Sequence, residues 1–236
     1  TAGTVVEEEF LEAASNNHIL AISLTDQQIA CAYSELSNGS FVVCLLPKEP
    51  RYDQLRALYE QLQPKELLIN EDEYFSQKDF AQVIDQTGCM RTRLPAWYFS
   101  RSQAFDELTE HMQSVSLKQF GLDETAIQLS AAGALLRYIR ETSKSSLAHI
   151  TEIEQLDQND HVLIDESTRK NLELITNLQE GSGSRTLFST VNYTCTSGGS
   201  RLLKSWIASP LAALDAILER QHQVTWFFEH APERQR

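Results

Sequence analysis

Residues 18–46, HILAISLTDQQIACAYSELSNGSFVVCLL, decide the fold of the first part of this 236-residue chain. Three apolar runs of strand length, His18–Leu24, Ile29–Ser37 and Ser40–Leu46, follow one another with only short polar breaks between them. The second break is Asn38-Gly39, and Asn-Gly between two apolar runs is the strongest short signal for a hairpin. The stretch therefore predicts an antiparallel meander of three strands.

Helical and strand patterns alternate after this meander. Apolar spacing predicts helices in residues 55–62, 74–84, 102–115 and 122–142, and strands in residues 66–70 and 89–94, the latter at an edge. We expect Phe75, Phe80, Val83 and Ile84 to point inward, and Asp123 to cap the helix that follows it. The order predicts an α/β domain with a ribonuclease H-like arrangement, in which helices flank a mixed sheet. Its boundary falls in the polar residues 143–160, so the domain spans residues 1–160.

Residues 161–236 read as helix and loop only, an all-α second part. We expect helices at Glu166–Leu178, from a Ser197 cap to Pro210, and at Leu214–Phe228. The last helix carries an apolar stripe that should be buried, made of Leu214, Ile217, Leu218, Gln221, Val224 and Phe228. Either its own neighbours cover this stripe, or the packing partner lies beyond Arg236. We expect the second.

The net charge of −13 is confined to the first part. Residues 1–160 hold 25 acidic and 12 basic residues, whereas residues 161–236 hold eight of each. An acidic surface repels phosphate, so the first part is a poor nucleic-acid binder and suits a basic protein partner, unless its charge serves solubility alone. The four scattered cysteines, the lack of a signal peptide and the lack of a long apolar run predict a cytoplasmic protein without a membrane span.

Catalytic patterns are missing from the sequence. A ribonuclease H-like nuclease needs a carboxylate in its first strand to hold a metal ion, but residues 19–24 carry none, and we expect Glu71, Asp72 and Glu73 to lie solvated on a loop. Gly181-Ser182-Gly183 lacks the ending of a phosphate loop and follows a helix, so we interpret it as a helix stop. The six histidines show no zinc spacing. We assign no catalytic, cofactor-binding or metal-binding residue.

Three motifs point to a family. The sequences RKNLEL at residues 169–174, GSRLLKSW at 199–206 and AAGALLRY at 131–138 closely resemble segments of the MutS family of DNA mismatch-repair ATPases. The resemblance implies that residues 1–160 form a connector domain (domain II) and that residues 161–236 form the first helices of the core or lever domain (domain III).

The resemblance also implies a division of labour within a longer protein. The wedge that reads mismatches would lie upstream and the ATPase domain, with its ATP and Mg²⁺, downstream, so this chain would be a non-catalytic fragment. It would relay between mismatched double-stranded DNA, bound by the full-length protein, and the state of the ATPase. The parent protein is expected to be a homodimer. Arg169, Lys170, Arg201 and Lys204 would lie on solvated faces or in internal ion pairs rather than on DNA.

In this family the connector docks the amino-terminal part of MutL through a helix that matches residues 102–115. The resemblance therefore marks Asp106, Glu107 and Glu110 as MutL contacts. Family members carry a glutamine pair where this chain has Asp106 and Glu107, which implies a more basic partner surface; otherwise the two are ordinary surface acids.

The sequence is also compatible with two other functions. One is a stand-alone ribonuclease H-like metal-dependent nuclease. The other is a MutS relative that acts in recombination rather than in repair.

Overall fold

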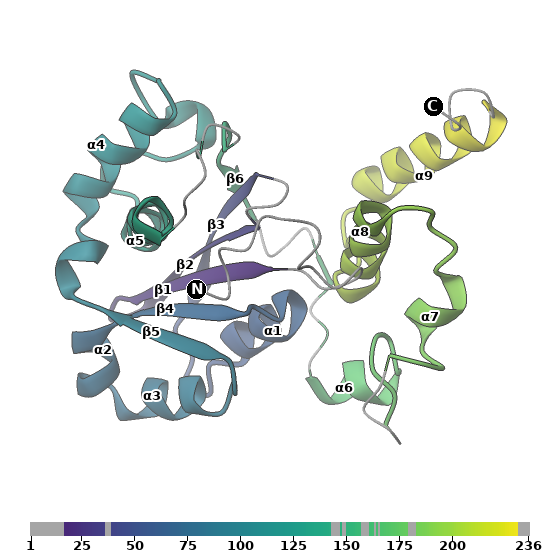
Figure 1. Ribbon diagram of the computed structural model, residues 1–236, viewed down its shortest axis with the longest axis horizontal. Coiled ribbons are helices and arrows are strands. Elements are labelled where there is room, and N and C mark those ends of the chain that lie inside the picture. Colours follow the sequence, from purple (N-terminus) through teal and green to yellow (C-terminus); the bar gives the residue numbers. More distant parts are fainter. Residues whose placement is uncertain are drawn as a thin grey trace.

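Six strands form one mixed sheet in the first part of the molecule. The computed structural model describes residues 17–35, 39–142, 147, 150–156, 161–162, 164, 166–178 and 183–230. The sheet order is β5-β4-β1-β2-β3-β6 (Figure 1). The strands are β1 (His18–Leu24), β2 (Gln28–Glu35), β3 (Ser40–Pro47), β4 (Glu66–Asn70), β5 (Met90–Leu94) and β6 (Glu154–Gln155).

The predicted meander is confirmed. β1, β2 and β3 pair antiparallel, with Ile22 opposite Cys31 and Cys31 opposite Cys44. β4 then pairs parallel with β1, and β5 pairs parallel with β4 at one edge of the sheet. Asn38 of the predicted Asn-Gly turn lies outside the described residues. The sequence did not predict β6, a two-residue strand that pairs parallel with β3 at the opposite edge.

Helices cover both faces of this sheet. α4 (Arg101–His111) and α5 (Gln128–Thr142) lie on one face, and α1 (Asp53–Leu62) and α3 (Lys78–Asp85) lie on the other (Figure 1). α2 (Glu71–Ser76) follows β4 directly, and a short 3₁₀ helix, η3 (Ala96–Phe99), connects β5 to α4. Each face of the sheet has its own cluster of buried side chains, so the predicted mixed sheet with flanking helices is confirmed.

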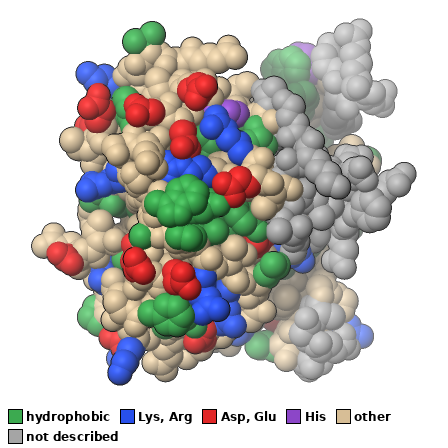
Figure 2. Space-filling model, turned by 60° about the vertical axis from the view of Figure 1, so that its left-hand side comes forward, with side chains coloured by type: hydrophobic (Ala, Val, Ile, Leu, Met, Phe, Trp, Pro, Cys, Tyr) green, Lys and Arg blue, Asp and Glu red, His purple; other side chains and the backbone are tan. Residues whose placement is uncertain are grey.

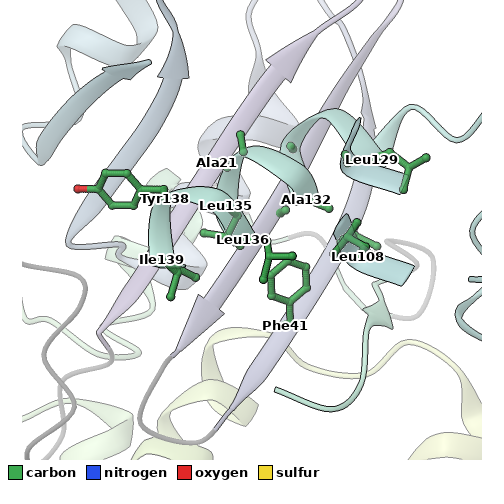
Figure 3. Close-up of a cluster of buried hydrophobic side chains, with 14 of the residues drawn as sticks. Ala21, Phe41, Leu108, Leu129, Ala132, Leu135, Leu136, Tyr138 and Ile139 are labelled. Carbon is green, nitrogen blue, oxygen red and sulfur yellow. The ribbon is translucent and has the colours of Figure 1, made fainter. Parts of the chain in front are cut away.

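α5 is the most deeply buried helix. All residues from Leu129 to Ile139 are buried, because β1, β2 and β3 lie under one side of α5 and α4 and η3 pack on another. Phe41 of β3 and Leu108 of α4 meet Leu135 and Leu136 in this core (Figure 3). Burial of each such side chain contributes about 1.5–3 kcal/mol. Between Leu129 and Ile139, α5 therefore has no solvent-exposed face.

Several predicted elements differ from the structure. Residues 74–84 are two helices instead of one, because Gln77 is extended between α2 and α3. Phe75 consequently points outward and is 63% exposed, whereas Phe80, Val83 and Ile84 are buried as predicted. Glu71, Asp72 and Glu73 are not on a loop: they form the first turn of α2, where the side chain of Asn70 caps the helix and the acids favour its amino-terminal dipole.

Two helix boundaries also shift. α4 ends at His111 rather than at residue 115. α5 begins at Gln128 rather than at residue 122, so Asp123 does not cap it. Instead, Asp123 Oδ1 accepts hydrogen bonds from the backbone and the hydroxyl of Thr125, at 2.8 and 2.6 Å. This local turn precedes the helix, in competition with helix formation there.

The part of the chain after residue 160 carries four helices among its described residues: α6 (Glu166–Asn171), α7 (Leu187–Val191), α8 (Ser197–Ala208) and α9 (Leu214–Glu229). α6 is shorter than predicted, α7 was not predicted, and Thr196 rather than Ser197 caps α8, through a hydrogen bond from Gly199 N. α9 has the predicted extent to within one residue, and its own described neighbours do not bury its apolar stripe, which disagrees with the first of the two alternatives for this helix. None of its residues is buried, and Phe228 is 75% exposed.

Candidate interaction surface on helix α4

α4 is anchored to α5 by one side of its surface. Ala104 and Leu108 are fully buried, and Ala104 approaches Gly133 of α5 so closely that a Cβ at Gly133 would lie 2.3 Å from the Cβ of Ala104. Glycine at position 133 is therefore what lets the two helices touch. The opposite side of α4, with Asp106 and Glu110 one turn apart, faces solvent.

Glu107 differs from the two exposed acids, because it forms an ion pair with Arg137 of α5. Both of its carboxylate oxygens accept from Arg137 Nε, at 2.9 and 2.8 Å. Arg137 is buried, and its Nη1 also donates to the carbonyl oxygens of Trp97 and Tyr98, at 2.8 and 2.5 Å. Of the three predicted MutL contacts, the structure thus brings Asp106 and Glu110 together on the outer face and holds Glu107 against α5.

An exposed tryptophan precedes α4 in η3. The Trp97 side chain is 54% exposed, and its ring lies 4.1 Å from the ring of Tyr98. Figure 2 shows that hydrophobic side chains gather near the middle of this side of the molecule, with acidic and basic side chains around them. An aromatic anchor with a charged rim is a common composition for a protein-binding surface. We assigned Trp97 no role from the sequence, and no local pattern distinguishes this exposed tryptophan from a buried one.

The sheet and α8 meet at a second charged contact. Glu35 at the end of β2 is buried, and its Oε1 lies 3.5 Å from Nε of Arg201 on α8. His18 lies nearby in β1, where burial lowers its pKa, while the charge of Glu35 and a contact with the Leu62 carbonyl act to raise it. The expectation that Arg201 forms an internal ion pair is confirmed.

The other basic residues of this region have different surroundings. Nε and Nη1 of Arg169 are buried without a hydrogen-bond partner among the described residues, and this burial lowers the pKa of the guanidinium. Lys170 is exposed and Lys204 is half-buried.

Glu73, at the carboxyl ends of β1 and β4, has structural partners. Glu73 accepts hydrogen bonds from Leu24 N (2.8 Å), the Ser23 hydroxyl (3.1 Å) and the Asn70 amide (3.2 Å), and burial raises its pKa. Its position is thereby fixed between β1 and α2. In the residues described by the structure, no group of three or more His, Cys, Asp or Glu side chains has the arrangement of a metal site.

A cavity of about 280 Å³ lies between α1 and α3 on the other face of the sheet. Its floor is apolar, with Leu20, Leu55 and Leu67, and a hydrogen bond from Arg56 to Gln86 (2.9 Å) spans its rim. It contains no nucleophile–base pair. Separately, none of the described helices is long and apolar enough to cross a membrane.

Comparison with known proteins agrees with this architecture. The family described as MutS domain II matches residues 17–151, and the family described as MutS domain III matches residues 167–236. A protein named DNA mismatch repair protein MutS in Treponema denticola is 34% identical over 97% of this chain. Proteins of the same name in Treponema pallidum and Myxococcus xanthus are each 32% identical, over 98% and 96% of the chain. The chain spans about a quarter of the length of these relatives, 26–27%.

Proposed function

Because the chain belongs to the MutS family of DNA mismatch-repair proteins, we propose that it supplies the connector and the first lever helices of such a protein. In this role it performs no chemistry itself. It relays between mismatched DNA and the state of the ATPase, and it offers a docking surface for a MutL-like partner. The observation that carries the proposal is that two consecutive segments of the chain match two consecutive domains of the family.

The strand order supports a ribonuclease H-like description of the connector. Three antiparallel strands continue through β1 into two parallel strands, β4 and β5, with helices on both faces. The first strand, residues 19–24, carries no carboxylate, so this proposal gives the sheet a scaffold role and not that of a nuclease.

One ion pair supports a relay between the sheet and the helices that follow it. The Glu35–Arg201 pair links β2 to α8. Within the helical region, Val162 N donates to Pro210 O at 2.8 Å beside a bridge between His161 and Leu211, which joins residues 161–162 to residues 210–211. A buried charge that loses its partner costs several kcal/mol, so the Glu35 carboxylate favours arrangements in which α8 stays near the sheet. A rigid helix held in this way transmits a displacement at one end to the other.

Docking of a MutL-like protein is assigned to the outer face of α4. Asp106 and Glu110 are exposed there, and the ion pair between Glu107 and the buried Arg137 fixes the helix that presents them. Two carboxylates one turn apart attract a basic surface, which accelerates association more than it raises the affinity. The partner surface is therefore expected to carry lysine or arginine side chains.

Titration calorimetry of the chain against the amino-terminal domain of its cognate MutL tests this assignment. The double variant Asp106→Lys/Glu110→Lys should weaken binding at least about tenfold. The matched control is Glu71→Lys/Asp72→Lys, which makes the same change in charge at two exposed acids of α2 and should bind like the parent chain. An equal loss of affinity in both variants would show that net charge alone causes the effect. If the folded parent chain does not bind, the proposal that these domains dock MutL on their own loses its support.

The remaining activities are proposed for the longer protein. ATP and Mg²⁺ would bind in its ATPase domain, mismatched double-stranded DNA would bind to the whole protein, and the protein would act as a homodimer. We place this action in the cytoplasm, where the four cysteines would stay reduced.

A further inference from the structure

The outer edge of β5 is an exposed strand edge. β5 is the terminal strand of the sheet and pairs only with β4 among the described strands. Met90, Arg91 and Arg93 are exposed, and Thr92 is half-buried. A terminal strand presents unpaired backbone N–H and C=O groups, which can pair with an added strand from another chain.

The two faces of β5 differ in chemistry. Arg91 and Arg93 pair in register with Leu67 and Ile69, whose side chains belong to the cluster under α1 and α3. Thr92 lies on the opposite face, where its hydroxyl donates to Glu66 Oε1 at 2.6 Å. Because side chains alternate along a strand, Met90 shares this second face. An added strand would therefore meet cationic side chains on one face and Met90 on the other.

Of the two arginines on this edge, Arg93 has the guanidinium that is available to a ligand. Its guanidinium lies over the rings of Phe75 and Tyr74, 5.4 and 5.8 Å from their centroids, and it forms no ion pair in the part of the chain that the structure describes. Arg91, by contrast, is already paired with Asp85 at 2.5 Å. Phe75, which the sequence placed in the core, thus serves as an exposed aromatic support that orients Arg93.

We propose that the β5 edge binds an extended segment of a protein partner in which acidic and apolar residues alternate, as an added strand. Its acidic side chains face Arg93 and Arg91, and its apolar side chains face Met90. Backbone hydrogen bonds supply affinity, and the charge-assisted bond to Arg93 supplies selectivity. The site has the opposite charge preference from the outer face of α4, and the inference does not depend on MutL docking.

Selection of a displayed library of random twelve-residue peptides on the intact chain tests this inference. Selected peptides should alternate acidic and apolar residues. One of them, synthesised with a fluorophore, should bind the parent chain in an anisotropy titration. Its affinity for the Arg93→Glu variant should be about tenfold lower. The matched control Arg140→Glu changes an exposed arginine at the end of α5 and should leave binding unchanged. Circular dichroism checks that both variants are folded.

A second version of the peptide separates strand addition from attraction by charge alone. Methylation of alternate backbone nitrogens on the edge-facing side removes the hydrogen bonds that the peptide N–H groups donate and places methyl groups against the edge, without changing the charge, and it should abolish binding. The inference is overturned if no peptide is enriched, if the selected peptides are basic, if Arg93→Glu binds as well as the parent chain, or if the methylated peptide binds normally. Binding of MutL to the same preparations is measured separately, so either proposal can fail alone.

Discussion

The sheet domain, residues 17–156, and the helices of residues 161–230 differ in how they are stabilised. The sheet domain buries hydrophobic side chains in two clusters, one on each face. In the helical region only two described hydrophobic residues are buried, Leu174 and Ala208, and α9 exposes Phe228, Trp226 and Leu214. The first region therefore has a core that supports independent folding, whereas the second is held mainly by helix caps, short-range hydrogen bonds and its contacts with the sheet.

The same substitution in the two regions should give the largest contrast. Phe41→Ala removes a fully buried ring beneath α5 and should lower the free energy of unfolding by about 3–5 kcal/mol. Phe228→Ala on α9 removes a ring that is 75% exposed and should change it by less than about 0.5 kcal/mol. Urea denaturation followed by circular dichroism measures both. A similar loss in the two variants would show that α9 is packed in solution.

Replacing one glycine by alanine in each region should change the stability of the chain in opposite directions. Gly133→Ala places a methyl group against Ala104 and should destabilise the chain by about 1–3 kcal/mol, because α4 must move away from α5. Gly198→Ala on α8 meets no atom within 4 Å and should stabilise that helix by up to about 1 kcal/mol. Thermal unfolding of the two variants measures the sign of each change. Stabilisation by Gly133→Ala would mean that α4 and α5 do not touch at this position.

Two acids on α4 should differ in their contribution to the stability of the sheet domain. Glu107→Ala leaves the buried Arg137 without its carboxylate and should cost about 1–2 kcal/mol. Glu110→Ala, at an exposed position, should cost less than about 0.5 kcal/mol. The urea midpoint of each variant, compared with that of the parent chain, measures this difference. If both variants match the parent chain, the ion pair contributes no net stability, and Glu107 joins the exposed acids as a candidate contact.

The sequence predicted the sheet domain better than it predicted the helical region. Continuous apolar runs and an Asn-Gly turn were sufficient for β1, β2 and β3, because these strands are buried on both faces and strands of this kind are apolar along their whole length. Phe75 was misplaced because the break at Gln77 has no glycine or proline to mark it. The stripe of α9 correctly predicted a helix. Amphipathic spacing shows which side of a helix is apolar but not whether a neighbour covers that side, and the described neighbours of α9 leave its stripe unburied.

The candidate site was predictable only in part. Spacing placed Asp106, Glu107 and Glu110 on one helix, but the separation of Glu107 from the other two depends on how closely α4 approaches α5 at Gly133. That approach is a tertiary contact between segments about thirty residues apart, which no local pattern encodes. The same holds for Arg93, whose aromatic support arises only because α2 ends before Gln77.

The smallest predicted effect is a dependence of stability on pH that arises in the sheet domain. His18 is buried, and this burial lowers its pKa below the ordinary value of 6.5 despite the opposing charge of Glu35. The unfolded chain therefore binds a proton at His18 more readily than the folded chain does. Its contribution to stability is complete above pH 6.5 and is lost as the pH falls below that value.

His18→Gln keeps a side chain that can hydrogen-bond near the Leu62 carbonyl but cannot be protonated. Its unfolding free energy, measured in urea at pH 7.5, 6.5 and 5.5, should fall less steeply with acidity than that of the parent chain. His222→Gln, at an exposed position on α9, should follow the parent chain at all three values. Parallel curves for His18→Gln and the parent chain would mean that His18 is protonated as easily in the folded state as in the unfolded state. In that case the Glu35 carboxylate, and not desolvation, would govern the charge at the junction between β1, β2 and α8.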